Sequence, residues 1–202
     1  MAEREPRRYE LGKRAESMEE TRRRIAAATF ELHTLIGPKA TTISAIAERA
    51  GVQRWTVYRH FPDDLSLFTA CVAHGFGVMP SPDPESWLAI ADPQERVRTA
   101  LAELYAFYRE TESAWDNILR DLPTMPALIE ANAPVVELWA RMTELLSEGW
   151  GAKGRRKQLV QAVAAHALDF HAWRQLARDG QLTDAEIVEL MTSLFRSAAG
   201  AR

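Results

Sequence analysis

The sequence predicts an all-α protein of about nine helices, and three observations lead to this prediction. Apolar residues recur at intervals of three and four along most of the chain, as they do on one face of a helix. Residues that begin and end helices flank these segments, with Ser, Thr or Asp before the starts and Gly or Pro after the ends. Strand-like alternation of apolar and polar residues between turn signals is absent. The 202 residues suffice for one or two domains.

The first third of the chain divides into an arm and a group of short helices. Residues 1–17 carry charges of both signs without periodicity and are predicted to be a flexible arm. Helices are expected from Ser17 to about residue 36, from 42 to 50, from 53 to 60, and again after Pro62. The Gly- and Pro-rich stretch between 75 and 84 is the clearest linker. We therefore place a first domain at residues 18–78.

The rest of the chain, residues 85–202, is predicted to form a second helical domain. Helices begin at Pro93 and Pro134, because proline is favoured in the first turn, and a shorter helix is expected at about 114–120. A long helix is expected over 155–178, closed by Gly180, and a last one over 183–198.

Composition excludes several classes of protein. The single cysteine, Cys71, can form no internal disulfide and no four-thiolate zinc site, and it fits a reducing cytoplasm. The N-terminus lacks a signal-peptide core, and no stretch approaches the ~18 apolar residues of a membrane span. We therefore expect a cytoplasmic protein without a membrane partner.

The charge is unevenly distributed. The net charge of −3 argues at first against nucleic acid as a partner. Residues 1–62, however, contain twelve Lys or Arg and eight Asp or Glu, a net +4, whereas residues 63–202 contain 13 and 20, a net −7. A basic segment followed by an acidic one makes a nucleic-acid partner worth testing.

The most informative segment runs from residue 42 to residue 61. Two short helices joined through Gly51 form a helix-turn-helix candidate. Ala47 is small enough for a close helix crossing, Gly51 suits a turn with positive φ, and Val52 can fill the angle between the helices. Polar residues that could enter a major groove open the second helix, at Gln53, Arg54 and Thr56.

This segment resembles the DNA-binding segment of TetR-type transcriptional regulators. The shared pattern is Ile-Ala-x-x-Ala-Gly-Val followed by Thr-x-Tyr-x-His-Phe, here at Ile46, Ala47, Ala50, Gly51, Val52, Thr56, Tyr58, His60 and Phe61. The resemblance is close over residues 20–75 and elsewhere extends only to the number and length of helices. It implies a ligand-responsive repressor that, as a homodimer, releases a near-palindromic operator in double-stranded DNA on binding a small apolar or aromatic effector.

The resemblance also implies roles for individual residues. Thr42 would cap the first motif helix and touch a phosphate, and Arg54 suits the edge of a guanine. The full set of implied DNA contacts is Thr42, Gln53, Arg54, Trp55, Thr56, Tyr58, Arg59 and His60. Trp55 stands where the family usually has a small residue, Asp64 where it usually has Lys, and His33 where a core Phe is common. Three consecutive arginines, Arg22, Arg23 and Arg24, are further phosphate candidates.

Large side chains beyond the motif are candidates for the effector pocket, although they equally suit an ordinary core. They are Phe107, Trp115, Met125, Trp139, Met142, His166, Phe170 and Trp173. In the resembled family the last two long helices pair with those of a second subunit. Candidate dimer contacts on these helices are Ala162, Val163, Ala165, Ile187, Leu190 and Leu194.

Other functions remain as alternatives. One is a helical small-molecule-binding protein or enzyme with a vestigial DNA-binding domain, and another is an activator or a regulator without a ligand. The sequence contains no recognisable nucleophile–base set, and His166 and His171 do not share a helix face, so the prediction is no enzyme, no catalytic residue, no metal and no cofactor.

Overall fold

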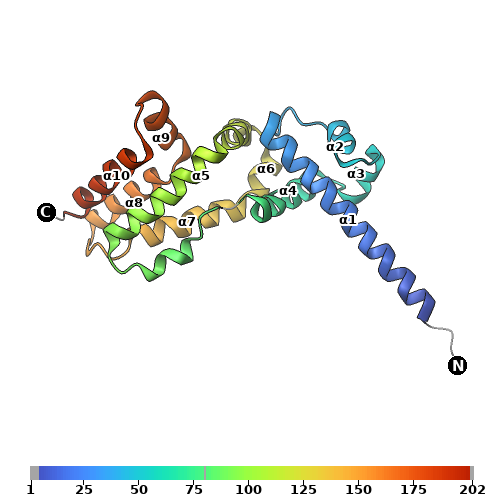
Figure 1. Cartoon of the computed structure of the whole chain (residues 1–202), viewed down its shortest axis with the longest axis horizontal. Coiled ribbons are helices and arrows are strands. Elements are labelled where there is room, and N and C mark those ends of the chain that lie inside the picture. The colour runs from blue at the N-terminus through green and yellow to red at the C-terminus, as the bar shows by residue number, and fades with distance from the viewer. Residues whose placement is uncertain (1–4, 80, 201–202) are drawn as a thin grey trace. The chain divides into compact units, whose positions relative to one another are not determined.

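The computed structural model describes residues 5–79 and 81–200, with side chains from residue 16 onward. Every regular element within these ranges is helical (Figure 1), which confirms the all-α prediction. No helix in the described part of the chain has the length and apolar character needed to cross a membrane. The elements are α1 (Glu5–Ile36), α2 (Ile43–Ala50), α3 (Arg54–His60), α4 (Asp64–Val78), η1 (Pro84–Ala89), α5 (Pro93–Asp121), η2 (Leu122–Thr124), α6 (Pro126–Ala131), α7 (Ala133–Ser147), α8 (Arg155–Ala167), α9 (Phe170–Arg174), the π-helical turn η3 (Gln175–Asp179) and α10 (Asp184–Ala199).

The chain forms two compact units. Unit 1 comprises residues 1–79 and 113–132, and unit 2 comprises residues 80–112 and 133–202. The division after residue 79 falls in the predicted linker. Residues 113–132, predicted to belong to the second domain, pack in unit 1 instead, because Leu128 and Ala131 of α6 are buried in its core. Helix α5 therefore contributes residues to both units.

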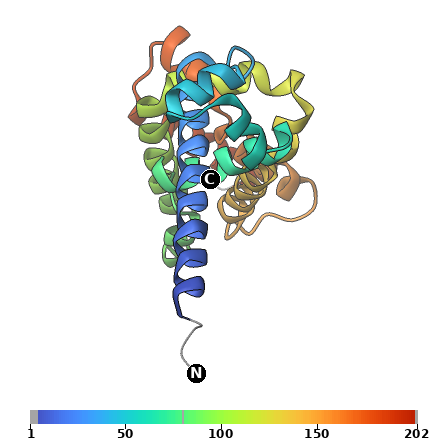
Figure 2. The ribbon, with the colours of Figure 1, turned by 90° about the vertical axis from the view of Figure 1, so that its right-hand side faces the viewer.

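The core of unit 1 joins α1, α2, α3, α4 and α6. Ile25 and Val57 are fully buried in it, and Ala47 lies in the core where α2 packs against α3, as its small size predicts. Figure 2 shows α2 and α3 beside the C-terminal half of α1. The helix-turn-helix is thus held against one long helix.

Two helices are longer than predicted. Helix α1 begins at Glu5, so Ser17 lies inside it and does not cap it, and residues 1–4 of the predicted arm lie outside the described residues. The residues between Glu5 and Ser17 are mostly good helix formers, and Pro6 falls in the first turn, where it is tolerated. Helix α5 continues from Pro93 to Asp121 and includes the segment predicted as a separate helix, since no Gly or Pro interrupts it.

Unit 2 packs α5, α7, α8 and α10 around large buried side chains such as Tyr105, Met142 and Phe195. Arg96 is buried too, and its guanidinium donates to the Leu145 carbonyl at 3.0 Å and to the Ile90 carbonyl at 2.9 Å. Backbone carbonyls near the end of α7 are thereby satisfied.

The long helix predicted over 155–178 is broken. Helix α8 ends at Ala167, and α9 begins after Asp169, whose carboxylate accepts from the Ala172 amide at 2.7 Å. Tyr105 donates to the Ala167 carbonyl at 2.9 Å, and Tyr108 to the Leu168 carbonyl at 2.6 Å. These hydroxyls replace helical hydrogen bonds, so the helix can end without leaving buried carbonyls unsatisfied.

His33 is a buried polar residue in unit 1. Its side chain is packed edge-on against Phe68, with ring centroids 5.4 Å apart, and its Nδ1 lies 3.6 Å from the Cys71 Sγ. Burial lowers the pKa of His33 to about 4, although the nearby Asp121 carboxylate acts in the opposite direction. His33 is therefore neutral at neutral pH.

This burial predicts a pH dependence of stability. Below pH 6.5 the unfolded chain takes up a proton on His33 that the folded protein does not. The free energy of unfolding should therefore fall from pH 6.5 toward pH 4, by at most about 3 kcal/mol from this residue, at 1.36 kcal/mol per pKa unit. Urea unfolding of the wild type and His33→Phe at several pH values measures the difference. Carboxylate protonation affects both proteins alike, so equal pH slopes would contradict the prediction.

Candidate nucleic-acid interface

The first helix of the motif, α2, begins after Thr42 and ends at Gly51, as the sequence predicts. Thr42 is the N-cap of α2, and its hydroxyl accepts from the Ala45 amide at 3.1 Å. Gly51 ends α2 with φ 64° and ψ 40°, a left-handed conformation that costs glycine little. The Val52 amide then donates back to the Ala47 carbonyl at 2.9 Å. This turn sets the direction in which α3 leaves α2.

Two arginines of α1 bind the C-terminal ends of the motif helices. Arg24 donates to the carbonyls of Ala50 and Gly51 at the end of α2. Arg22 donates to the His60 carbonyl at the end of α3 at 2.8 Å, and its guanidinium lies 4.2 Å from the centroid of the Phe61 ring. A cation at a helix C-terminus is favoured by the exposed carbonyl dipoles. Arg22 and Arg24 therefore position the motif helices, Arg23 pairs with Glu20, and phosphate contact by these arginines stays a prediction.

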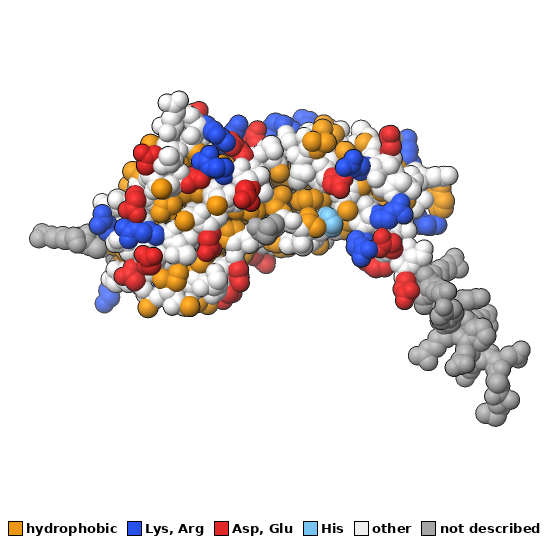
Figure 3. Space-filling view, viewed as in Figure 1, with side chains coloured by type: hydrophobic (Ala, Val, Ile, Leu, Met, Phe, Trp, Pro, Cys, Tyr) orange, Lys and Arg blue, Asp and Glu red, His pale blue; other side chains and the backbone are white. Residues whose placement is uncertain are grey.

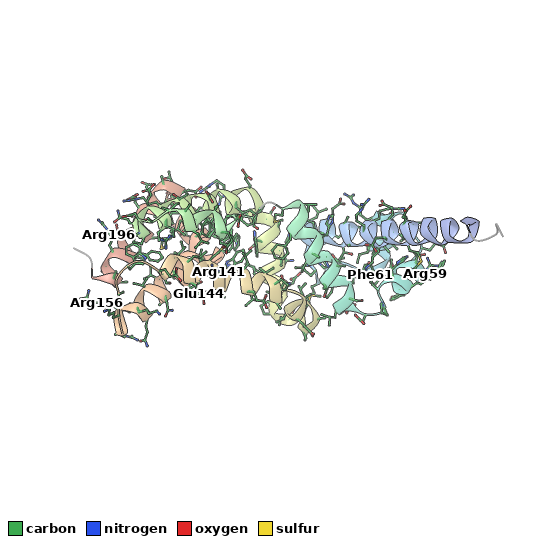
Figure 4. The ribbon with its side chains drawn as sticks, turned by 90° about the horizontal axis from the view of Figure 1, so that it is seen from below. Arg59, Phe61, Arg141, Glu144, Arg156 and Arg196 are labelled. Carbon is green, nitrogen blue, oxygen red and sulfur yellow. The ribbon has the colours of Figure 1, made fainter. Side chains whose placement is uncertain are left out.

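Helix α3 presents one exposed face. Arg54, Trp55, Tyr58 and Arg59 are exposed, with Trp55 and Tyr58 retaining 56% and 50% of their surface. Thr56, predicted to face the groove, is only 8% exposed and lies beneath this surface beside Val57. Figure 4 labels Arg59 and Phe61, at the C-terminal end of α3.

Trp55 is held by its neighbours on the same helix. Its indole N–H donates to the Gln53 Oε1 at 2.6 Å, and the Arg59 guanidinium lies 4.6 Å from the ring centroid. Gln53 occupies the N-cap position of α3 without making a side-chain cap, because its carbonyl oxygen is used by Trp55. The arrangement leaves the Gln53 amide N–H groups as hydrogen-bond donors at the start of the helix.

Charge at the end of α3 is mixed. Burial, with the positive charges of Arg59 and Arg22, lowers the pKa of His60, whose Nε2 is buried and has no hydrogen-bond partner in the described part of the chain. Asp63 caps α4 by accepting from the Ser66 amide at 2.7 Å, and both Asp63 and Asp64 are exposed. Asp63 thus has a structural role as a cap, and both carboxylates face solvent after the end of α3.

The eight predicted effector residues are divided between the two units, six in unit 2 and two in unit 1. Phe170 and Trp173 pack against Tyr108, with centroid distances of 5.3 and 5.5 Å, in the core of unit 2. Phe107 and Met142 are buried, whereas His166 is exposed. Trp139 donates to the Leu168 carbonyl at 3.2 Å, while Trp115 and Met125 belong to unit 1. Most of this aromatic set is core packing, the other interpretation that the sequence allows.

The predicted dimer residues divide by exposure. Leu190 and Leu194 of α10 are each 41% exposed, and Ala162 and Ala165 of α8 are also exposed. Val163 is half-buried, but Ile187 is fully buried and cannot reach a partner, because its side of α10 packs into unit 2. Leu159, absent from the prediction, is 40% exposed on α8. Its position one turn before Ala162 and Val163 is the signal that could have found it.

Comparison with known proteins agrees with this geometry. Residues 25–71 match the bacterial regulatory proteins of the tetR family. The chain is 37% identical to the HTH-type transcriptional regulator SrpR of Pseudomonas putida, over 75% of this chain and 85% of SrpR. It is 32% identical to the HTH-type transcriptional repressor KstR of Mycobacterium tuberculosis over 95 residues, 47% of this chain and 42% of KstR, so the match spans less than half of that relative.

Solved structures show the same fold. NalD, the secondary repressor of the MexAB-OprM multidrug efflux pump in Pseudomonas aeruginosa, is 24% identical, with a TM-score of 0.61 over 90% of this chain and 96% of NalD. The fold and motif define a helix-turn-helix regulatory protein. The chain belongs to the TetR family, which confirms the resemblance seen in the sequence, and this family is regulatory rather than enzymatic.

The contacts of Arg24 and Arg23 predict that their substitutions differ in their effect on thermal stability. Arg24→Ala removes the donor to two carbonyls of the turn, and since Arg24 is exposed we expect a loss of about 1 kcal/mol. That loss corresponds to a melting temperature lower by about 2–4 °C for a protein of this size. Arg23→Ala removes the same charge from the neighbouring, exposed position and should leave the melting temperature nearly unchanged. Equal shifts in thermal melts of the two variants would contradict the positioning role of Arg24.

Proposed function

We propose that the protein is a ligand-responsive transcriptional repressor that binds a near-palindromic operator as a homodimer. The observation that carries this proposal is the exposed face of α3, where Arg54, Trp55, Tyr58 and Arg59 follow the Gly51 turn. Such a helix fits the major groove of DNA. The repressor names of KstR and NalD support the direction of regulation. A regulator of this kind would act in the cytoplasm.

Each exposed side chain has a chemistry suited to a part of DNA. Arg54, in the first turn of α3, can form two hydrogen bonds with a guanine edge. Trp55 presents a fixed apolar ring suited to a thymine methyl or a deoxyribose. Thr42, Tyr58 and Arg59 offer donors for phosphates, which position the helix without reading sequence. Asp64 repels phosphate, so binding should be modest in affinity and strongly salt-dependent.

The surface charges of unit 2 do not favour DNA contact. Several of its surface arginines pair with carboxylates, as in Arg98–Glu189, Arg109–Asp184 and Arg178–Glu112. Figure 3 shows acidic and basic side chains interspersed on this face of the unit. Paired cations contribute little to phosphate binding. We therefore assign DNA contact to unit 1 alone.

An apolar stripe on α8 and α10 is the dimer surface of this proposal. It consists of Leu159, Ala162, Leu190 and Leu194, all exposed on two helices that pack against each other. Arg156, at the start of α8, donates to the Ala199 carbonyl at 3.0 Å and holds the end of α10 (Figure 4). A two-fold pairing of this stripe would give a dimer with two recognition helices.

Variants of α3 test the DNA-binding surface. A fluorescently labelled fragment from upstream of the gene, and fragments selected from a random DNA library, serve as ligands in anisotropy titrations at several salt concentrations. Tyr58→Phe should weaken binding to all fragments alike, because it removes a phosphate donor, whereas Arg54→Ala should relax the preference at one base position by about 1–3 kcal/mol. Lys153→Ala, an exposed change in unit 2, is the control. Absence of binding by the wild type at low salt would favour the vestigial-domain alternative.

A single charge tests the dimer surface. Leu194→Glu should convert the dimer to monomer, since two carboxylates would face each other across the two-fold axis, while the fold stays intact because the side chain is exposed. Sedimentation velocity measures the mass. Leu88→Glu, at a 49% exposed position of unit 2 outside the stripe, should leave the dimer unchanged. A dimer that survives Leu194→Glu shows that the stripe is not the interface.

A further inference from the structure

Three exposed side chains at α3 form a connected cluster of an amide, an indole and a guanidinium, from Gln53, Trp55 and Arg59. The Trp55 indole N–H donates to the Gln53 Oε1 at 2.6 Å, and the Arg59 guanidinium lies 4.6 Å from the centroid of the Trp55 ring. Trp55 and Arg59 are four residues apart and so share one face of the helix. The ring is thereby held by two neighbours, yet 56% of the Trp55 surface stays exposed.

The exposed part of Trp55 is apolar in character. The indole has one polar group, its N–H, which can only donate a hydrogen bond. In this cluster the N–H is engaged by Gln53, and the Arg59 guanidinium covers part of one ring face. What Trp55 offers to a partner is therefore ring carbon, and a partner that brings an apolar group removes that carbon from water.

The indole also orients the Gln53 amide. Because the indole N–H is a donor, the Gln53 atom that faces it is the carbonyl oxygen and not the nitrogen. The amide hydrogens of Gln53 make no hydrogen bond within the described part of the chain, and the residue is exposed. The cluster thus presents a hydrogen-bond donor directly beside an apolar ring.

Among the four bases, thymine has the major-groove edge that matches this arrangement. It carries the O4 acceptor and a methyl group on adjacent ring carbons. Cytosine has an amino donor where thymine has O4, and guanine has two acceptors without a methyl group. A pair with adenine would require Gln53 to share its oxygen with the indole N–H.

We propose that Gln53 and Trp55 together read a thymine in the bound DNA. The Gln53 amide donates to O4, the 5-methyl group packs on the Trp55 ring, and Arg59 positions that ring. DNA binding then depends on a single 5-methyl group in the major groove. This inference rests on the proposed DNA-binding function and names the base and the group that the surface of α3 selects.

Uracil in place of thymine tests the methyl contact, because it lacks the methyl group and keeps O4. Each thymine of the selected fragments is replaced in turn, and anisotropy titrations give the dissociation constants. At the thymine read by Trp55, uracil should raise the dissociation constant of the wild type about fourfold, the effect of one buried methyl group.

The same uracil scan of Trp55→Ala separates this contact from effects of uracil on the DNA itself. Trp55→Ala should bind thymine and uracil alike at that position, since the ring is gone. Lys153→Ala, an exposed change in unit 2, should discriminate as the wild type does. Absence of any position at which uracil weakens the wild type but not Trp55→Ala overturns the proposal.

5-Methylcytosine, paired with guanine, tests the hydrogen bond, because it keeps the methyl group and carries an amino group in place of O4. At the same position it should raise the wild-type dissociation constant about tenfold, the effect of roughly one lost hydrogen bond. Gln53→Ala should narrow this difference and still prefer thymine to uracil, because Arg59 continues to hold the ring. Equal discrimination by the wild type and Gln53→Ala contradicts the role of Gln53 as donor.

The cluster itself can be tested without DNA. Selective ¹⁵N labelling of the six tryptophans gives one indole N–H signal for each, and Trp55→Phe identifies the signal of Trp55. Gln53→Ala should shift that signal, whereas Lys153→Ala should leave it in place. An unshifted signal shows that the indole is not bound to Gln53 and overturns the proposed orientation of the amide. Circular dichroism confirms that each variant is folded.

Failure of thymine reading and failure of the proposed function give different results. A wild type that binds the selected fragments without a methyl-dependent position overturns thymine reading and leaves the repressor function standing. A wild type that binds no DNA at low salt overturns both, even where the indole signal responds to Gln53→Ala.

Discussion

The constraint on which this structure depends is that helix ends leave carbonyl groups without partners. At one helix end after another, donors from a different helix meet this need. Arg24 and Arg22 of α1 bind the ends of α2 and α3, and Tyr105 and Tyr108 of α5 bind the end of α8. Asn117 of α5 donates to the Thr34 and Leu35 carbonyls at the end of α1. Arg96, also of α5, donates to the Leu145 carbonyl near the end of α7. The lengths and directions of the helices are set by these long-range contacts.

This explains which parts of the fold the sequence could predict. Thr42, Gly51 and the Thr183–Glu186 capping box act within a few residues, and the structure contains all three. The end of α8 depends instead on hydroxyls about 60 residues earlier, and no local pattern over 155–178 reveals them. The same holds for the arginines of α1, where three adjacent cations look alike in the sequence. Only the fold distinguishes Arg22 and Arg24, which bind backbone, from Arg23.

The candidate site could be predicted from the sequence to a similar extent. The motif located α3 and most of its exposed residues, because spacing fixes which helix and which turn they occupy. Thr56 and Ile187 differ from the prediction because burial depends on the packing of helices far apart in sequence. Aromatic composition could not separate a pocket from a core, and in unit 2 it describes a core. His33 stands where a core Phe is common, and its burial against Phe68 and Cys71 follows from the packing of α1 on α4.

Helix α2 is fixed by contacts at both of its ends. It has eight residues, about 12 Å at 1.5 Å per residue. One end receives the loop whose Lys39 amide donates to the Asp121 carboxylate, and the other end passes through Gly51 into α3. Gly37, which begins this loop, has a φ of 93°, a left-handed conformation that favours glycine. The Asp121 contact before α2 and the Gly51 turn after it together fix where α2 begins and the direction in which α3 leaves it.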